Sequence, residues 1–214
     1  GYNDFIICLG YKGYIIKEYF INYFYHHSDL TVDLTTNQVK IHDTNSEKFK
    51  VTLVDTGLNT KTAGRLKRIE KYIDGDHFML TYGDGVADVD LKALHEFHFK
   101  HGKLATLTTV QQEGKFGGLE FCADNKVKSF KEKPMGDGHW INGGFFVLNK
   151  EVFNILGDNC DEEMWEESPL ETLTSDNELM AFKHRGFWRC MDALRDNVIL
   201  DELWNTNEAK WKIW

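Results

Sequence analysis

Short apolar runs alternate along the chain with longer stretches in which apolar residues recur every three or four positions. The runs predict strands at 4–10, 31–34, 38–42, 50–55, 77–82, 105–111, 119–121, 127–130 and 145–148. The stretches of helical period lie at 12–24, 65–73, 91–101 and 151–156. Strands that alternate with helices in this way predict right-handed crossovers and a mostly parallel sheet flanked by helices.

The predicted fold class is therefore α/β, with a Rossmann-like sheet that binds ligands at the carboxyl ends of its strands. No linker-like tract, low-complexity segment or internal repeat interrupts the pattern, so we expect one domain over residues 1–214. The chain begins at Gly1 and enters an apolar run, Asp4 to Gly10, that is typical of a buried strand. Because an edge strand is the more usual first element, we expect a preceding segment to be missing.

The formal charge of -9 comes from one part of the chain. Residues 151–180 hold ten Asp and Glu and no Lys or Arg. We interpret this stretch as an acidic helical surface, and the nearly neutral remainder can present a basic pocket to an anionic ligand. The pI near 5.5 argues against general affinity for nucleic acid. No apolar run reaches the roughly 18 residues that a membrane span requires.

Cysteine and histidine spacing indicates neither a disulfide framework nor a metal finger. The four cysteines are far apart and form no CxxC pair, so we expect reduced thiols in a cytoplasmic protein. Five histidines lie on polar helical stretches, and we interpret them as solvated side chains: His26, His27, His95, His98 and His101.

Asp84 follows the predicted strand 77–82 and is flanked by Gly83 and Gly85. A carboxylate there lies at the ligand-binding edge of the sheet, and glycines let a bulky ligand approach the backbone. Mg²⁺ is usually held by one or two carboxylates together with substrate phosphates, so Asp84 is a candidate metal ligand. The alternative is a turn-forming aspartate. Asp90 is better explained as the N-cap of the following helix.

A polar loop at 55–64 opens into a helix that carries Arg65, Lys67 and Arg68. Small hydroxyl residues, glycines and helix N-terminal amides suit a nucleotide, and arginine can bind a phosphate or a base edge. The P-loop spacing is absent. A solvated loop before an ordinary basic helix explains the same residues equally well.

Two further charged residues lie close to the ends of apolar segments. Pro134 restricts Lys133 to an extended conformation after the predicted strand 127–130, where its ammonium could meet a phosphate. A basic strand end is more often simply exposed. Asp192 follows the aromatic segment 186–188 and could supply a second carboxylate to the same ion as Asp84.

Six stretches together resemble the sugar-phosphate nucleotidylyltransferase family. They occur in the family's order: VDTG at 54–57, TAGRLKR at 62–68, TYGDGVAD at 81–88, EKP at 132–134, INGGFF at 141–146 and GFWRCMD at 186–192. The first three are similar to the branch that transfers cytidylyl groups to glucose 1-phosphate. The resemblance extends from Gly1 to about Trp211.

The resemblance implies a Mg²⁺-dependent reaction of CTP with α-D-glucose 1-phosphate that gives CDP-glucose and pyrophosphate. It also implies a cytoplasmic homo-oligomer that binds neither nucleic acid nor membrane. Its site residues carry over as follows: Asp84, Lys133 and Arg65 catalytic; Asp84 and Asp192 on the metal; Thr60, Arg65 and Gly83 on the nucleotide; Glu132, Lys133, Asn142 and Gly143 on the sugar phosphate.

The chain departs from the family pattern in two places. Ala63 replaces the first glycine of a Thr-Gly-Gly-Arg stretch, and we expect its methyl group close to the base. The family's first strand and its glycine-rich phosphate loop have no counterpart after Gly1, which fits the missing segment expected above. Two alternatives stay open: an enzyme of the same kind that uses UTP or dTTP, and a non-catalytic module that binds a sugar nucleotide.

Overall fold

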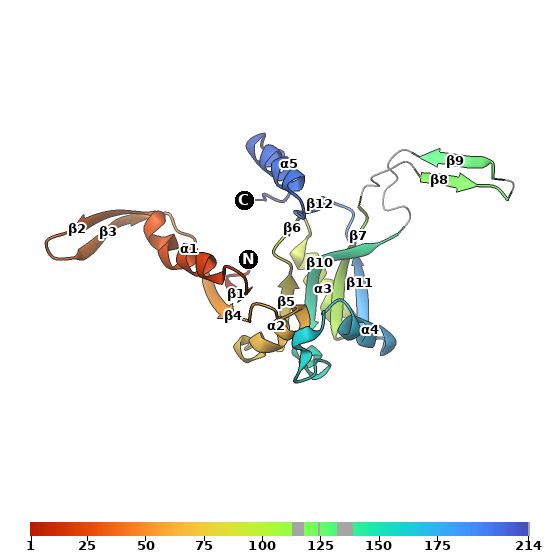
Figure 1. Ribbon diagram of the computed structural model, residues 1–214, viewed down its shortest axis with the longest axis horizontal. Helices are drawn as coiled ribbons and strands as arrows, with labels where there is room; N and C mark the ends of the chain where they lie inside the picture. Colours follow the sequence, from red (N-terminus) through yellow and green to blue (C-terminus); the bar gives the residue numbers. More distant parts are fainter. Residues whose placement is uncertain (113–117, 124, 132–138, 214) are drawn as a thin grey trace. The chain divides into compact units, whose positions relative to one another are not determined.

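The computed structural model describes residues 1–112, 118–123, 125–131 and 139–213, and Figure 1 shows their helices and strands. The chain forms two compact units. The first unit comprises residues 1–74 and 153–171, and the second comprises residues 75–152 and 172–214. The expectation of one domain over the whole chain stays a prediction.

The first unit begins with a parallel strand pair and a projecting hairpin. β1 (Asp4–Leu9) pairs in parallel with β4 (Lys50–Asp55), and α1 (Gly13–His26) follows β1. β2 (Ser28–Asp33) and β3 (Gln38–Thr44) form the antiparallel hairpin that the polar pattern predicts. Burial in β1 is restricted to Leu9, so the expectation of a strand buried along its length was wrong for this unit.

α2 (Thr62–Ile69) forms the packed part of the first unit. Its apolar residues recur at helical spacing, so that Ala63, Leu66 and Ile69 share a buried face. The helix ends in a 3-10 turn, η1 (Glu70–Tyr72), and packs against another, η4 (Cys160–Glu162). Trp165, which is 1% exposed, belongs to the same core.

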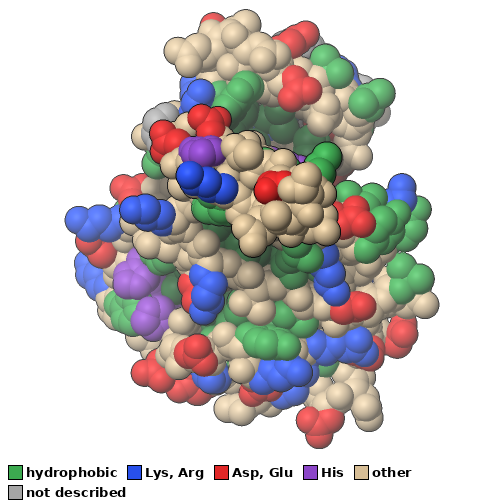
Figure 2. Space-filling view, turned by 90° about the vertical axis from the view of Figure 1, so that its left-hand side faces the viewer, with side chains coloured by type: hydrophobic (Ala, Val, Ile, Leu, Met, Phe, Trp, Pro, Cys, Tyr) green, Lys and Arg blue, Asp and Glu red, His purple; other side chains and the backbone are tan. Residues whose placement is uncertain are grey.

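α1 contrasts with α2 because none of its residues is buried. Tyr14, Tyr19 and Ile21 are among its exposed apolar side chains. Figure 2 looks at the molecule from the side of this helix and the hairpin, and hydrophobic side chains reach the surface there among basic, acidic and histidine side chains. Apolar residues at helical spacing therefore do not by themselves identify which of the two helices is packed.

A four-stranded sheet of order β11-β7-β10-β5 forms the centre of the second unit. It contains β5 (His77–Thr81), β7 (Ala105–Val110), β10 (Ile141–Asn149) and β11 (Leu179–Lys183). β7 runs parallel to β11, and β10 runs antiparallel to both of its neighbours. Three of the four strands therefore share one direction, as a mostly parallel sheet requires, and β10 is the reversed member.

The remaining elements of the second unit pack on this sheet or extend from it. They are β6 (Gly85–Ala87), α3 (Leu91–His101), β8 (Gly118–Phe121), β9 (Val127–Lys131), β12 (Trp188–Cys190) and α5 (Leu194–Asn205). Val89, Leu94 and Val147 form a buried cluster between α3 and the sheet. The side chain of Asp90 accepts a hydrogen bond from Ala93 N at 2.9 Å, which confirms it as the N-cap of α3.

Two elements connect the units along the chain. They are a 3-10 segment, η3 (Lys150–Asn154), and α4 (Ser168–Ser175). The sequence predicts an α-helix at 151–156, and the structure has only the short 3-10 segment there. All four cysteines are free thiols. Among the described residues, no helix has the length and apolar character to cross a bilayer.

His98 is buried, contrary to the expectation of a solvated side chain. It is 2% exposed, because α3 presses it against β7 and β10. Its Nδ1 lies 2.8 Å from Thr106 Oγ1, and its Nε2 lies 2.8 Å from Asn149 Oδ1. Burial lowers the pKa of His98, so the neutral imidazole is the native form. The position of His98 in a polar helical stretch did not reveal this burial, because the sequence does not show that α3 packs on the sheet with the face that carries His98.

Candidate functional site

Asp84 lies in the turn between β5 and β6, and both its neighbours along the chain are glycines. β6 pairs antiparallel with β12, so that Gly85 is opposite Cys190. One residue further along, the carbonyl of Asp84 accepts a hydrogen bond from Met191 N at 2.7 Å. The ladder therefore brings Asp84 next to the chain segment that carries Asp192.

Asp192 and Asp84 are both exposed, so their carboxylates are open to a ligand. The thiol of Cys190 donates to Asp192 Oδ2 at 3.1 Å. Burial raises the pKa of Cys190, and the hydrogen bond to Asp192 raises it further, so the thiol stays protonated and acts as a donor. This contact orients one oxygen of Asp192 without neutralising its charge.

The donor chemistry of this pair fits Mg²⁺. Carboxylate oxygens are hard ligands, and Mg²⁺ in proteins is typically held by one or two of them while substrate phosphates complete its coordination. Within the described residues, no group of three or more His, Cys, Asp and Glu side chains could hold a metal by itself. A metal on Asp84 and Asp192 would therefore take its remaining ligands from water or from substrate phosphates.

Gly83 and Gly85 leave open space beside Asp84. A Cβ atom added to either glycine would meet no described protein atom within 4 Å, and neither has the positive φ that favours glycine. Packing and backbone conformation thus do not explain these two glycines. The described structure leaves open space beside the backbone at both positions.

Asn142 and Gly143 lie in a bulge of β10, which we define as residues 142–144. The register of β10 on β7 shifts after Asn142 and resumes at Phe146. Gly144 has φ +78°, and its N–H donates to Asn142 Oδ1 at 2.8 Å. The bulge lies just beyond the carboxyl end of β5, because the residue that follows it, Phe145, is paired with Thr81, the last residue of β5.

Two aromatic residues that the sequence did not single out hold this bulge. Asn142 Nδ2 donates to the hydroxyl of Tyr82 at 3.3 Å, and Trp188 Nε1 donates to the carbonyl of Gly143 at 2.8 Å. Tyr82 directly precedes Gly83, and Trp188 is the first residue of β12. Both lie within the family stretches 81–88 and 186–192, and that position was the only signal available in the sequence.

The predicted nucleotide loop of the first unit is a tight turn after β4. Gly57 N donates to Asp55 Oδ1 at 3.0 Å, and Gly57 has φ +91°, which requires a glycine. Thr56 is fully buried, and its hydroxyl donates to the carbonyl of Leu9 at 2.9 Å. Thr60 is 8% exposed, with its side chain between Gly57 and Gly64.

Arg65 points back from α2 toward this loop. Its Nη1 donates to Thr56 Oγ1 at 2.8 Å and to the carbonyl of Leu9 at 3.2 Å, and its Nη2 donates to the carbonyl of Leu58 at 3.4 Å. A Cβ on Gly10 would come within 2.8 Å of the guanidinium, so a larger residue there would displace the Arg65 side chain from this position. Within the described chain, Nε and the second Nη2 hydrogen have no acceptor and are available to a ligand.

The sequence predicts that the N-terminal amides of α2 are open to a ligand, and the structure shows that two amides there are already hydrogen-bonded. Lys61 N donates to the carbonyl of Asp161 at 2.8 Å, and Ala63 N donates to that of Glu163 at 3.1 Å. These two amides therefore cannot bind a phosphate. Asp161 also pairs with Arg68, so part of the acidic stretch is a packed support for α2 rather than a free surface.

Ala63 is fully buried on the inner face of α2. The expectation that its methyl group lies near the base was therefore wrong. Gly64, the next residue, is the position without room for a side chain, because a Cβ there would lie 2.7 Å from Asp161 Cα.

The other predicted site residues are divided between the units or lie outside the structure's description. Asp84, Gly83, Asn142, Gly143 and Asp192 come together in the second unit, whereas Thr60 and Arg65 belong to the first. Glu132 and Lys133 lie outside the described residues. Their predicted contacts with the sugar phosphate stay predictions.

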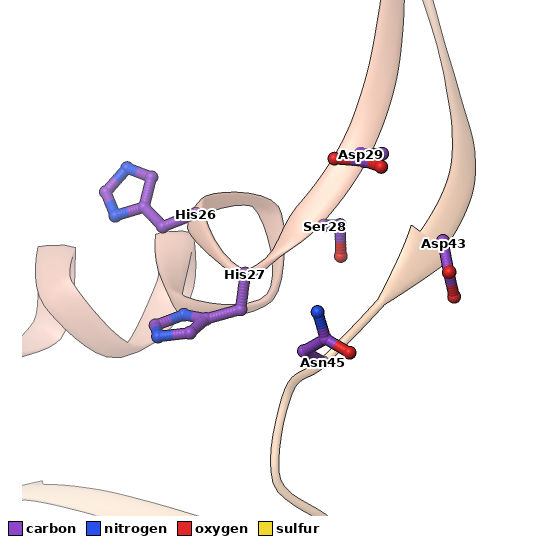
Figure 3. Close-up of a pocket in the computed structure, with 6 residues that line it drawn as sticks. All are labelled: His26, His27, Ser28, Asp29, Asp43 and Asn45. Carbon is purple, nitrogen blue, oxygen red and sulfur yellow. The ribbon is translucent and has the colours of Figure 1, made fainter.

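A pocket of about 280 Å³ lies elsewhere, where α1 leads into β2. Figure 3 shows Ser28 and Asn45 facing it, while His26 is directed away and the ring of His27 lies beside the helix. His27 is stacked on Tyr23 with ring centroids 4.1 Å apart. The pocket contains none of the predicted site residues and is open and polar, so it is not a candidate for the chemistry.

Comparison with known proteins identifies the same family across most of the chain. A family model described as nucleotidyl transferase matches residues 17–193. The glucose-1-phosphate cytidylyltransferase of Salmonella typhimurium is 54% identical over 100% of this chain and 82% of its own length. A probable glucose-1-phosphate cytidylyltransferase of Bacillus subtilis is 41% identical over 100% of this chain and 83% of its own length.

Solved structures show the same fold at lower identity. HddC from Yersinia pseudotuberculosis superposes with a TM-score of 0.64 at 22% identity, over 95% of this chain and 80% of that one. A UDP-glucose pyrophosphorylase complexed with UDP-glucose has a TM-score of 0.54 at 15% identity, over 75% of this chain and 67% of that one. The α/β fold is thereby confirmed. The chain belongs to the nucleotidyl transferase family, and within it to the group of the glucose-1-phosphate cytidylyltransferases.

Proposed function

We propose that this protein transfers the cytidylyl group of CTP to α-D-glucose 1-phosphate and releases pyrophosphate. The observation that carries the proposal is the 54% identity with the Salmonella typhimurium enzyme, which spans the whole chain. In the reaction, a phosphate oxygen of the sugar phosphate forms a bond to the α-phosphorus of CTP, and the bond between the α-phosphorus and the bridging oxygen breaks. The attacking oxygen is already anionic, so no general base is required.

The second unit would supply the metal ligands and part of the sugar site. Asp84 and Asp192 would hold Mg²⁺, and Asn142 and Gly143 would contact the sugar. The ion would neutralise negative charge on the triphosphate and on the departing pyrophosphate. The open space beside Gly83 supports its proposed place against the nucleotide.

The first unit would supply the remaining nucleotide contacts. The guanidinium of Arg65 donates hydrogen bonds to three acceptors of the protein itself, which fix its position. Its remaining N–H groups can therefore be donated to the nucleotide. We propose that Thr60 contacts the nucleotide beside Arg65. Lys133 is proposed to neutralise the sugar phosphate and Glu132 to bind a sugar hydroxyl.

Pyrophosphate release tests the proposal directly. Protein expressed from the complete coding sequence is assayed with glucose 1-phosphate, Mg²⁺ and CTP, UTP or dTTP in turn. We expect kcat/KM to be highest with CTP, by at least about tenfold. A preference for UTP or dTTP would assign the protein to another nucleotide branch. Binding of CDP-glucose without turnover of any triphosphate would identify a non-catalytic module.

Asp84→Asn tests the metal ligand. We expect turnover to fall on the order of a hundredfold or more, since an amide cannot supply the charge that holds the ion. Asp201→Asn, an exposed carboxylate on α5, is the matched control and should keep wild-type rates. Near-normal turnover of Asp84→Asn, with unchanged circular dichroism in both variants, would remove Asp84 from the metal site.

We also propose a cytoplasmic homo-oligomer, since its triphosphate substrate is made there and the family resemblance implies association. Trp204 is 43% exposed and supports a contact surface near the C-terminus. Trp211 supports it less, because its ring lies 5.1 Å from that of Phe187 in the same chain. Trp214 is outside the described residues.

A further inference from the structure

The predicted metal carboxylates and the predicted sugar contacts lie on one closed circuit of contacts in the second unit. From the bulge of β10, the circuit passes to Tyr82, along the backbone to Asp84, and across a hydrogen bond of 2.7 Å to Met191. It returns along β12 to Trp188, which donates to the bulge again at 2.8 Å. β6 and β12 lie together beyond the end of β5 in Figure 1.

Tyr82 contacts the bulge in two ways, through its ring and through a hydrogen bond of its hydroxyl. A Cβ on Gly144 would come within 2.7 Å of Tyr82 Cδ2, so the ring lies directly against the bulge backbone. Its hydroxyl accepts from Asn142 Nδ2, while Asn142 Oδ1 accepts from Gly144 N. The amide of Asn142 therefore has one orientation that satisfies both groups.

Trp188 holds the bulge from a different strand. Gly143 has no room for a side chain, because a Cβ would lie 2.9 Å from the carbonyl oxygen of Thr108. The backbone at Gly143 is thus pressed against β7, and the indole N–H of Trp188 binds its carbonyl. Trp188 also pairs with Ala87, which fixes β12 on β6.

We propose that Tyr82 and Trp188 are positioning residues, which fix the sugar-binding bulge relative to the carboxylates of Asp84 and Asp192. Neither needs to touch the reacting atoms. This inference rests on the proposed function, since it gives the bulge its role at the sugar phosphate. Small displacements of a substrate from its reactive geometry cost large factors in rate, so rigid support of the bulge has a direct catalytic value.

The test removes one hydrogen-bonding group at a time. Trp188→Phe deletes the indole N–H, and Tyr82→Phe deletes the hydroxyl, while each keeps an aromatic ring. We expect each variant to raise the KM and the dissociation constant for glucose 1-phosphate about fivefold, the usual worth of one hydrogen bond. The KM for CTP should change less than twofold. Tyr14→Phe, at an exposed tyrosine of α1, is the matched control because it also deletes one hydroxyl, and it should match wild type.

A double-mutant cycle separates positioning from a general loss of structure. If Tyr82 acts through Asn142, then Tyr82→Phe should have little further effect on glucose 1-phosphate binding in an Asn142→Ala background. A merely structural role would instead lower kcat and the melting temperature in every background and leave both KM values unchanged. That second pattern would overturn the inference.

Calorimetric binding of glucose 1-phosphate keeps this inference distinct from the proposed function. Turnover by the wild-type protein decides the proposed function alone. The dissociation constants of Trp188→Phe and Tyr82→Phe decide the positioning role, even if the wild type turns over no triphosphate. Equal binding by wild type and both variants would contradict the role, and so would a wild type that does not bind the sugar phosphate.

Discussion

The glycines of the candidate site differ in what surrounds them. Gly64 has protein backbone where its side chain would be, whereas Gly83 faces open space. The same residue type therefore has a packing role in the first unit and, under the proposed function, a ligand-binding role in the second. The sequence pattern alone shows both simply as glycines in family motifs.

Substitution by alanine should separate these two roles. Gly64→Ala forces a methyl group to 2.7 Å from Asp161 Cα, so we expect the free energy of unfolding to fall by about 1–3 kcal/mol. Gly83→Ala should change it by less than about 0.5 kcal/mol. Turnover with CTP should nevertheless fall about tenfold or more in Gly83→Ala, because the added methyl would occupy space proposed for the nucleotide.

Urea unfolding followed by circular dichroism measures the first effect, and pyrophosphate release measures the second. Equal stability of the two variants would contradict the packing role of Gly64. Wild-type turnover in Gly83→Ala would show that the nucleotide does not approach this backbone.

Among the elements, those with a long, clear pattern were predicted best. The bounds predicted for β4 and α3 are those observed, because each pattern is long enough to be read locally. β6 and β12 have three residues each and were not predicted as strands. Such short strands exist only through their pairing with each other, which no local pattern records. The reversal of β10 was unpredictable for the same reason.

The support of α2 was also hidden from the sequence. Acidic residues at 161–166 looked like a solvated surface, yet the carbonyls of this segment bind the first amides of α2. Thr62 adds a link in both directions, since its hydroxyl donates to Glu166 Oε2 at 2.7 Å and accepts from Trp165 N at 2.8 Å. An element of one region is therefore completed by residues about a hundred positions away.

Thr62→Val should loosen this element without changing its shape. It removes both hydrogen bonds and leaves Trp165 N without its acceptor, so we expect a loss of about 1–3 kcal/mol in the free energy of unfolding. Thr52→Val, in β4 of the same unit, is the control and should stay within about 0.5 kcal/mol of wild type. Denaturant unfolding of both variants at pH 7.5 is the measurement, and equal midpoints would refute the link.

On the scale of the whole molecule, a chain of hydrogen bonds joins α3 to the sheet of the second unit. Lys103 N donates to His101 Nδ1 at 2.9 Å, so the proton of His101 is on Nε2, which donates to Thr106 Oγ1 at 2.7 Å. Thr106 in turn donates to His98 Nδ1, and His98 Nε2 donates to Asn149 Oδ1. Every member is satisfied only while both imidazoles are neutral.

This chain predicts a loss of stability in mild acid. Burial lowers the pKa of His98 and of His101 below the ordinary 6.5; nearby His77 and His95 lower that of His98 further, and Glu178 partly offsets the shift at His101. Each unfolded histidine therefore binds a proton more readily than the folded one. The stabilisation is complete above pH 6.5 and declines as the pH falls below that value.

His98→Gln tests the assignment. At pH 8 we expect the substitution to lower the free energy of unfolding by about 1–3 kcal/mol, because it removes the buried hydrogen bonds of His98. We also expect the stability of the variant to decline less than that of wild type between pH 6.5 and 5. The measurement is the urea midpoint of wild type and variant across that range. The same slope in both proteins would assign the acid sensitivity to other groups.

The pairing of β6 with β12 has a consequence for the order in which the protein is made. Asp84 emerges from the ribosome about a hundred residues before the strand that brings Asp192 to it, so the two carboxylates meet only after the segment through Asp192 has been synthesised. A polypeptide released before Trp188 would keep β5 and Asp84 and lack the second carboxylate. Under the proposed function, competence to hold the metal thus depends on translation having passed Asp192.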